Sequence, residues 1–182
     1  MVQMNRAIFL DRDGTIIEEK NYLSDVNQIS LLENSVKGLK ILQDSFLLII
    51  VSNQSGVARG YFTEKEVNKV NEALLNMLEK QGVHISSVYY CPHYENGVVE
   101  KYSINCNCRK PKTGLIDKAC LDFAIDLNKS YVIGDKDSDI QLAQNAGCRS
   151  ILIKNSNYLN KIFPNHIAKD LYDAAKYIME KE

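Results

Sequence analysis

Short apolar runs alternate along this chain with segments of helical periodicity, and this alternation limits the fold more than any other feature of the sequence. Buried strands are predicted at 7–10, 46–51, 88–90, 131–133 and 150–153, with a further short strand at 29–32. Helices are predicted at 36–42, from the capping box at 63–66 to a stop at Gly82, and at 114–127, 138–146 and 168–180. Strands that alternate with helices pair through right-handed crossovers. The sequence therefore predicts an α/β fold with a three-layer, Rossmann-like, mostly parallel sheet.

Composition describes an ordinary globular chain. The 182 residues contain no internal repeat, low-complexity tract or linker, which predicts one domain spanning 1–182. A formal net charge of −1 argues against a nucleic-acid or anionic-membrane partner, and we expect a monomer. No apolar run approaches bilayer length, and no long apolar segment follows the amino terminus. A cytoplasmic location is therefore expected, where the five cysteines would stay reduced.

Polar side chains stand where three of the predicted strands end. Asp11 and Asp13 follow the first strand, Ser52 and Asn53 follow the second, and Asp135 follows the strand at 131–133. Ligands of open α/β sheets bind at the carboxyl ends of the strands. These side chains are therefore expected to converge on one edge of the sheet.

The chemistry of this set points to phosphoryl transfer. Two carboxylates one residue apart repel, so they need a cation or a shared proton, and one acid can be a nucleophile while the other carries a proton. Asp11, Asp13 and Asp135 suit Mg²⁺. Ser52 can donate to a phosphate oxygen, and Lys110, fixed by the following proline, can bind the phosphoryl group. Each residue alone has an ordinary explanation as a cap or surface side chain, but the joint pattern favours a site.

A second constellation consists of three thiols and an imidazole. Cys91, His93, Cys106 and Cys108 fall in the long irregular stretch from 91 to 111. Two pairs of buried thiols are the alternative, but a closed Cys₃His set is typical of structural zinc. The remaining cysteines, 120 and 148, are predicted to lie in the core. A zinc ion here would fix the base of the segment that carries Arg109 and Lys110.

The motifs Asp11-Arg12-Asp13-Gly14-Thr15, Ser52-Asn53-Gln54, Lys110 and Gly134-Asp135 resemble, in order, the four motifs of the haloacid dehalogenase superfamily of phosphatases. The resemblance implies that Asp11 attacks phosphorus and that Asp13 is the acid/base. It also implies that Ser52 and Lys110 hold the phosphoryl group. Mg²⁺ would be held by Asp11, the backbone carbonyl of Asp13 and Asp135. Asp137 and Asp139 rank below Asp135 as ligands, because their positions are those of helix caps.

The segments 52–60, 91–93 and 106–111 are further similar to the D,D-heptose 1,7-bisphosphate phosphatase family, a small branch without a large cap domain. This resemblance implies removal of the C7 phosphate from the heptose bisphosphate, in nucleotide-activated heptose biosynthesis for surface polysaccharide. It implies substrate contacts at Glu19, Lys20, Asn21, Tyr22, Ser52, Asn53, Gln54, Ser55, Arg109, Lys110 and Lys136.

Three other functions remain open at this point. The histidinol-phosphatase branch has a similar zinc loop, usually shorter, and the twelve residues between His93 and Cys106 favour the heptose branch. A receiver-like phospho-acceptor module would share the sheet, Mg²⁺ and a lysine, but needs neither Asp13 nor a zinc loop. A zinc-stabilised interaction module with a dead site is disfavoured by the intact Asp11, Asp13, Lys110 and Asp135.

Overall fold

The computed structural model describes residues 4–154 and 161–182, and it centres on a six-stranded sheet in the order β3-β2-β1-β4-β5-β6. Every neighbouring pair of strands is parallel, which confirms the predicted sheet. The strands are β1 (Ala7–Leu10), β2 (Leu47–Asn53), β3 (Ser87–Cys91), β4 (Tyr131–Gly134), β5 (Arg149–Ile153) and β6 (His166–Ala168). Strands β2 and β3 lie on one side of β1, and β4, β5 and β6 lie on the other, so β1 is central and the strand order reverses there.

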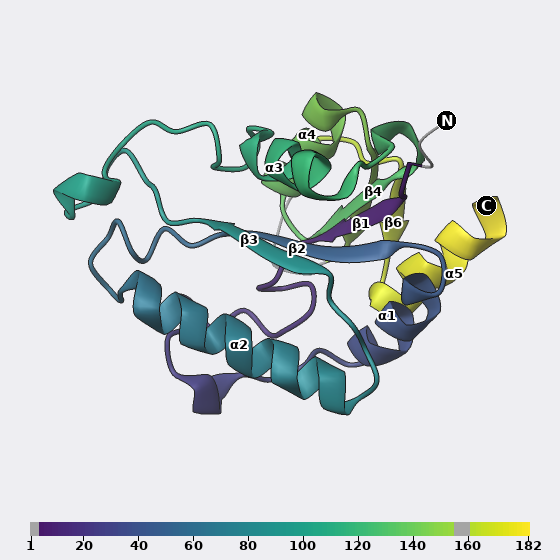
Figure 1. Ribbon diagram of the computed structural model, residues 1–182, viewed down its shortest axis with the longest axis horizontal. Coiled ribbons are helices and arrows are strands. Elements are labelled where there is room, and N and C mark those ends of the chain that lie inside the picture. The colour runs from purple at the N-terminus through teal and green to yellow at the C-terminus, as the bar shows by residue number, and fades with distance from the viewer. Residues whose placement is uncertain (1–3, 155–160) are drawn as a thin grey trace.

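Helices cover both faces of the sheet and give the three predicted layers (Figure 1). One outer layer holds α3 and α4, and the opposite layer holds α1, α2 and α5. The helices are α1 (Ser35–Gln43), α2 (Glu64–Lys80), α3 (Gly114–Phe123), α4 (Asp137–Ala146) and α5 (Leu171–Lys181). Helix α2 starts at the predicted capping box, in which Thr63 and Glu66 satisfy each other's backbone N–H groups.

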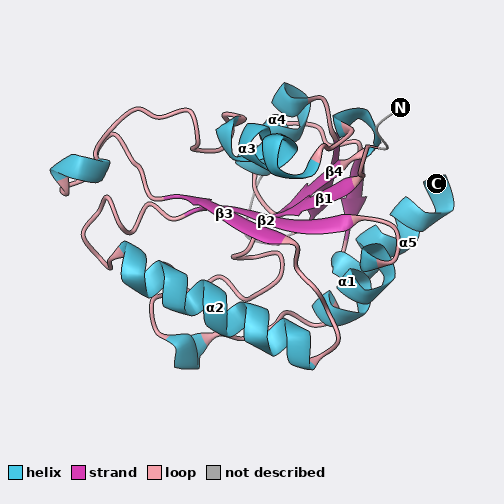
Figure 2. Cartoon of the chain, in the orientation of Figure 1, coloured by secondary structure: helices cyan, strands magenta, loops and turns pink. Residues whose placement is uncertain are grey.

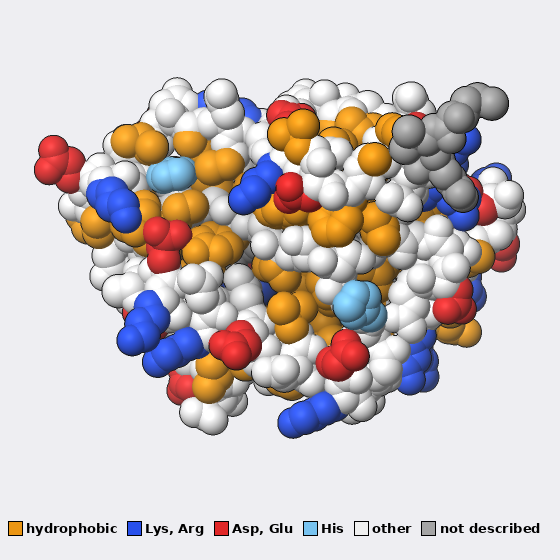
Figure 3. Space-filling model, in the orientation of Figure 1, with side chains coloured by type: hydrophobic (Ala, Val, Ile, Leu, Met, Phe, Trp, Pro, Cys, Tyr) orange, Lys and Arg blue, Asp and Glu red, His pale blue; other side chains and the backbone are white. Residues whose placement is uncertain are grey.

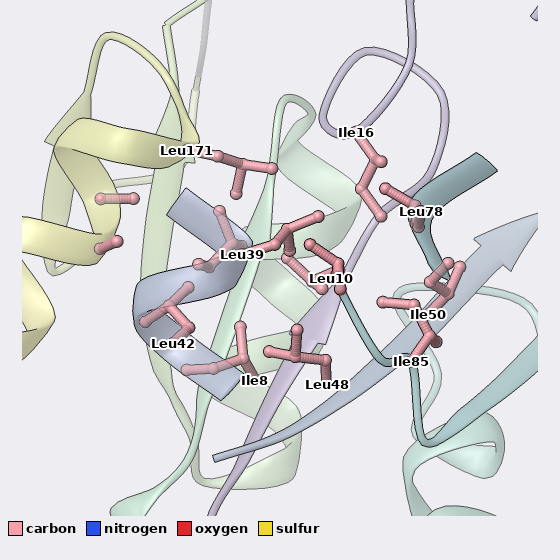
Figure 4. Close-up of a cluster of buried hydrophobic side chains, with 14 of the residues drawn as sticks. Ile8, Leu10, Ile16, Leu39, Leu42, Leu48, Ile50, Leu78, Ile85 and Leu171 are labelled. Carbon is pink, nitrogen blue, oxygen red and sulfur yellow. The ribbon is translucent and has the colours of Figure 1, made fainter. Parts of the chain in front are cut away.

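Alternation of side chains along β1 divides the core between the two helical layers. Ile8 and Leu10 pack into the larger cluster with α1, α2 and α5, together with Leu48 and Ile50 of the neighbouring strand (Figure 4). Phe9 points the other way, into the cluster formed with α3 and α4. Successive strand residues face opposite sides of a sheet, and both sides here are apolar. The burial of both faces therefore holds β1 rigidly at the centre of the sheet.

One predicted strand was wrong and one strand was not predicted. The stretch 29–32 makes only an isolated antiparallel bridge, between Leu31 and Ile17. At the other end of the chain, the sequence pattern missed β6, which pairs with β5. Helix α5 therefore begins at Leu171 rather than at 168, with the Asp170 side chain accepting a hydrogen bond from the backbone N–H of Asp173.

Helix α3 is shorter than predicted, because tertiary contacts end it at Phe123. Ala124 adopts a left-handed conformation with a φ of 48°. Its carbonyl accepts a 2.9 Å hydrogen bond from the N–H of Asn5, and the carbonyl of Asn5 accepts one of 2.8 Å from Asp126. A segment more than a hundred residues away in the sequence thus decides where this helix stops.

The connection from β3 to α3, residues 92–113, is a long irregular excursion that contains one turn of 3₁₀ helix, Glu100–Tyr102 (Figure 2). It projects beyond the carboxyl end of β3. Among residues 4–154 and 161–182 no insertion forms a large cap domain, as predicted. Acidic and basic side chains are interspersed with apolar ones on the face shown in Figure 3. None of the described helices is long and apolar enough to cross a membrane.

Candidate active site and metal centres

The charged centre of the molecule lies where β1 ends. Lys110 reaches it from the β3–α3 excursion, and its Nζ donates a 2.7 Å hydrogen bond to Asp11 Oδ1 and a 2.9 Å bond to the carbonyl of Val51. The same Nζ lies 2.6 Å from Asp139 Oδ1, an ion pair too poorly aligned for a hydrogen bond. All three ionisable side chains are buried, so each charge depends on the others for compensation.

The pairing decides the protonation states of Asp11 and Lys110. Burial by itself would raise the pKa of Asp11, but the charges of Lys110 and Lys136 outweigh it and hold that pKa below its usual value. Burial would likewise lower the pKa of Lys110, and the two carboxylates beside it raise it instead. An ionised carboxylate facing a charged lysine follows from this geometry.

Asp11, Asp135 and Asp139 bring oxygen atoms within 4.8 Å of one another. Burial, followed by repulsion from Asp11, raises the pKa of Asp135 to about 7, and burial raises that of Asp139 to about 6. Asp135 Oδ1 is buried and finds no hydrogen-bond partner among the described residues. An unpaired buried acceptor among clustered acids is the environment that a hard divalent cation relieves, so these residues fit Mg²⁺.

Gly14 allows the side chain of Asp135 to lie against the loop that follows β1. A Cβ atom at this position would stand 2.3 Å from Asp135 Oδ2, and its φ of +88° disfavours any residue with a side chain. The sequence Asp-x-Asp-Gly therefore combines two carboxylates with the one residue that lets a third come close.

The polar residues at the end of β2 hold other parts of the site in place. Gln54 Nε2 donates to both Ser52 Oγ, at 2.6 Å, and Asp13 Oδ2, at 2.9 Å. Asn53 forms a reciprocal pair with the backbone of Lys110, at 3.0 and 3.1 Å. Strand β2 thus fixes both Asp13 and the segment that carries Lys110.

A cavity of about 320 Å³ opens beside this centre. The sequence-predicted residues that line it are Asp11, Asp13, Glu19, Asn21, Tyr22, Asn53, Gln54, Ser55, Arg109, Lys110 and Lys136. Ser52 lies beneath it, bonded to Gln54, and Lys20 turns away to pair with Glu18. Lys136 is paired as well, with Glu19 at 2.9 Å. Both lysines are therefore partly neutralised within the protein.

Two arginines beside this cavity share an aromatic ring. The guanidinium of Arg59 lies 3.9 Å from the centroid of Tyr94, and that of Arg109 lies 5.2 Å from the same ring. Arg59 also stands 5.9 Å from the ring of Tyr22, and Arg109 donates to the carbonyl of His93. Neither arginine forms a salt bridge with a carboxylate in the described parts of the chain. Arg109, which lines the cavity, therefore presents a positive charge there that no carboxylate of the described residues pairs.

Cys91, His93, Cys106 and Cys108 come together where the excursion leaves β3. Cys108 Sγ lies 3.1 Å from Cys91 Sγ and 3.3 Å from both Cys106 Sγ and His93 Nδ1. These separations are far longer than a disulfide bond and near the ~3.7 Å expected between ligands of a tetrahedral zinc ion. The hydrogen bond with Cys91 lowers the pKa of Cys108 to about 5, which favours a thiolate. The donor set and its spacing fit zinc.

Cys91 is the last residue of β3, so one ligand is fixed by the sheet while Cys106 and Cys108 lie in the excursion. Cys120 and Cys148 pack with the smaller core cluster. Glu64 of α2 also holds the excursion, accepting hydrogen bonds from the hydroxyls of Tyr90 and Tyr102 at 2.9 and 2.6 Å.

Sequence comparison agrees with this geometry. A family model described as HAD-hydrolase-like matches residues 107–174. The D-glycero-alpha-D-manno-heptose-1,7-bisphosphate 7-phosphatase of Photorhabdus laumondii is 37% identical, with 95% of this chain and 96% of that protein covered. The chain belongs to the heptose-1,7-bisphosphate 7-phosphatase family of haloacid dehalogenase-like hydrolases. The predicted family and its class, phosphoric monoester hydrolases, are confirmed.

Other members of this family extend the comparison. The Haemophilus ducreyi D-glycero-beta-D-manno-heptose-1,7-bisphosphate 7-phosphatase is 42% identical over 80% of each chain. The D,D-heptose 1,7-bisphosphate phosphatase of B. bronchiseptica, solved with magnesium and phosphate, superposes with a TM-score of 0.83. The superposition covers 97% of this chain and 99% of that one, at 24% identity, and supports the fold. Named relatives thus include enzymes for both anomers.

Three residues of the site were missed or ranked low from the sequence. Asp139 does cap α4, accepting from the N–H of Lys136 at 3.1 Å, but it also faces Lys110. Asp137, by contrast, accepts hydrogen bonds from the backbone of Lys161. Arg12 and Arg59 carried no signal beyond their places inside recognised motifs, because only the folded chain shows what their guanidinium groups meet.

Proposed function

We propose that this protein is a Mg²⁺-dependent phosphatase that removes the C7 phosphate of D-glycero-D-manno-heptose 1,7-bisphosphate through an aspartyl-phosphate on Asp11. The observation that carries the proposal is the buried Asp11–Lys110 pair at 2.7 Å, on the wall of a cavity that Asp13 also lines. The names of the relatives at 35–42% identity support the choice of substrate.

Asp11 would supply the nucleophile. Its ionised carboxylate is engaged by Lys110 at Oδ1, which leaves Oδ2 for attack on phosphorus. Lys110 and Ser52 would hold the phosphoryl oxygens as negative charge builds. Asp13 would give a proton to the departing sugar oxygen and then take one from the water that hydrolyses the aspartyl-phosphate.

Two metal ions complete the proposal. Asp11, the backbone carbonyl of Asp13 and Asp135 would hold Mg²⁺, with Asp139 behind them. When bound, Mg²⁺ supplies positive charge that polarises the phosphoryl group. Cys91, His93, Cys106 and Cys108 would hold a structural Zn²⁺, which fixes the segment leading to Arg109 and Lys110.

Recognition of the second phosphate is assigned to Arg109. Lys20 and Lys136 already face Glu18 and Glu19, whereas Arg109 has no carboxylate partner in the described chain. A guanidinium can form a bidentate contact with a phosphate. We place the enzyme in the cytoplasm as a single-domain monomer, acting on a small sugar phosphate in heptose biosynthesis for surface polysaccharide.

The deciding experiment measures phosphate release from the heptose bisphosphate and from histidinol phosphate, both with Mg²⁺. We expect kcat/KM to be at least about tenfold higher for the bisphosphate, since one charged contact contributes roughly 1.4 kcal/mol or more. Arg109→Ala should remove most of that preference and spare small generic phosphates. Lys65→Ala, which removes an exposed cation on α2, is the control. Equal or better turnover of histidinol phosphate would refute the substrate assignment.

A further inference from the structure

Arg12 is the largest fully buried side chain in the described protein, and only 1% of it is exposed. A guanidinium group cannot lose its proton, so it is buried only where other groups satisfy its charge and its donors. Those groups are Asp13, the next residue, and Asn71 of α2. The proposed reaction gives Arg12 no role, although it stands between the two aspartates of the first motif.

Arg12 and Gln54 fix the carboxylate of Asp13. Oδ2 accepts from Arg12 Nε at 3.0 Å and from Gln54 at 2.9 Å, and it lies 2.9 Å from Arg12 Nη2. Oδ1 accepts one longer bond, 3.2 Å, from Arg12 Nη2. The Asp13 side chain is 14% exposed and lines the cavity. Oδ1 is therefore the oxygen with spare capacity for a further hydrogen bond.

Asn71 in turn holds Arg12. Its Oδ1 accepts a 2.8 Å bond from Arg12 Nη1, and the residue is buried in the middle of α2. Helix α2 supplies no lining residue to the cavity. A hydrogen-bonded chain, Asn71–Arg12–Asp13, thus connects this helix to the site. Each link uses a different donor of one planar guanidinium, which a lysine could not reproduce.

We propose that Arg12, anchored by Asn71, is a positioning residue that holds the Asp13 carboxyl group in the orientation that proton transfer requires. The inference rests on the proposed function. In the first half-reaction Asp11 bonds to phosphorus, the bond to the sugar oxygen breaks, and Asp13 protonates that oxygen. In the second, water bonds to phosphorus, Asp13 takes its proton, and Asp11 leaves. Arg12 exchanges no proton and keeps Asp13 aligned in both.

The test separates proton transfer from folding by using two leaving groups. A sugar phosphate needs its leaving oxygen protonated, whereas 2,4-dinitrophenyl phosphate does not. With 2,4-dinitrophenyl phosphate, only the hydrolysis of the aspartyl-phosphate therefore depends on Asp13. Arg12→Lys should lower kcat on the sugar phosphate about tenfold and Asn71→Ala about threefold, fractions of the 10²–10⁴-fold typical of general acid–base catalysis. KM should be unchanged, since neither residue is placed against the substrate.

With 2,4-dinitrophenyl phosphate both variants should give a burst of dinitrophenolate equal to the enzyme concentration, because the aspartyl-phosphate forms rapidly and hydrolyses slowly. Asn76→Ala, an exposed asparagine on the same helix, is the matched control and should behave as wild type. Asn71→Ala tests the same role by a second route, because it removes the anchor of Arg12 and leaves both Arg12 and Asp13 in the chain. It keeps the proposal testable if Arg12→Lys does not fold.

Asp13→Asn separates the positioning role of Arg12 from the acid/base role of Asp13. If it gives the burst and the leaving-group difference while Arg12→Lys and Asn71→Ala do not, the positioning role is overturned and the proposed mechanism stands. If these variants lose activity equally on both substrates without a burst, their role is structural and the inference is also overturned. If Asp13→Asn itself shows neither effect, the acid/base assignment fails, and the inference fails with it.

Discussion

The acidic centre and the thiol cluster both gather groups that bind metals, but the fold stabilises them differently. Asp11, Asp139 and Lys110 are buried where a packed strand, a helix and a loop meet, and the lysine balances part of the acidic charge. Three of the four residues in the thiol cluster lie in an irregular excursion, and their thiol and imidazole groups contact one another. The acidic centre is therefore preorganised by charge pairing and packing, whereas the thiol cluster would gain order from the proposed zinc ion.

The largest effect is expected from Asp11→Asn, which removes the proposed nucleophile and should leave the packing of β1 unchanged. Turnover should fall by several orders of magnitude, as when other covalent nucleophiles are removed. Thermal stability should fall less than when Lys110 is removed, because Asp139 still faces the lysine and the amide oxygen can still accept from it. Steady-state rates and a melting curve check this together. Near-wild-type rates would show that phosphoryl transfer does not pass through Asp11.

Removing the balancing cation should damage the acidic centre itself. Lys110→Met leaves Asp11 and Asp139 buried and uncompensated, a change that costs about 3–5 kcal/mol of unfolding free energy for buried pairs. Mg²⁺ should recover part of this loss by supplying another positive charge. Urea unfolding with and without Mg²⁺ measures both effects. Lys65→Met, at an exposed position of α2, should be neutral. Unchanged stability in Lys110→Met would contradict the charge-balance account.

Removing the proposed zinc ion should destabilise the thiol cluster and the excursion that carries it. Strong chelation, or Cys106→Ala, should lower the melting temperature by several degrees, at about 2–4 °C per kcal/mol for a chain of this size. Activity should fall with it, and added Mg²⁺ should not restore it. Cys120→Ala, which removes a thiol outside the cluster, should keep the zinc content. Elemental analysis that finds no zinc in fully active protein would refute the structural role.

The smallest effect concerns the link between the excursion and α2. Hydrogen bonds from Tyr102 and Tyr90 lower the pKa of Glu64 below its usual 4.5. Because the folded pKa is depressed, this contribution is present above pH 4.5 and is lost as the pH falls through the folded value. Glu64→Gln should therefore cost less than about 1 kcal/mol near neutral pH, since solvent screens the group, and nothing in acid. A pH-independent loss in urea unfolding would argue against the ionised hydrogen bonds.

The sequence alone determined the features that depend on neighbouring residues. The apolar runs around Phe9 and Val132, the capping box at Thr63 and Glu66, and the glycine stop after α4 were all predicted, because burial and capping act over a few residues. Asp11 and Asp135 follow from the same logic, since parallel strands that end in acids bring them to one edge.

Only the tertiary structure decided which of several similar side chains face the site and which are paired elsewhere. Asp139 and Asp137 have the same local pattern, but one faces Lys110 and the other caps the chain at Lys161. Lys20 and Arg59 are both cations near the cavity, and only Lys20 finds a carboxylate partner among the described residues. Arg12 is polar in sequence and fully buried in the fold. These outcomes depend on residues far away in the chain, whose distances and burial no local pattern encodes.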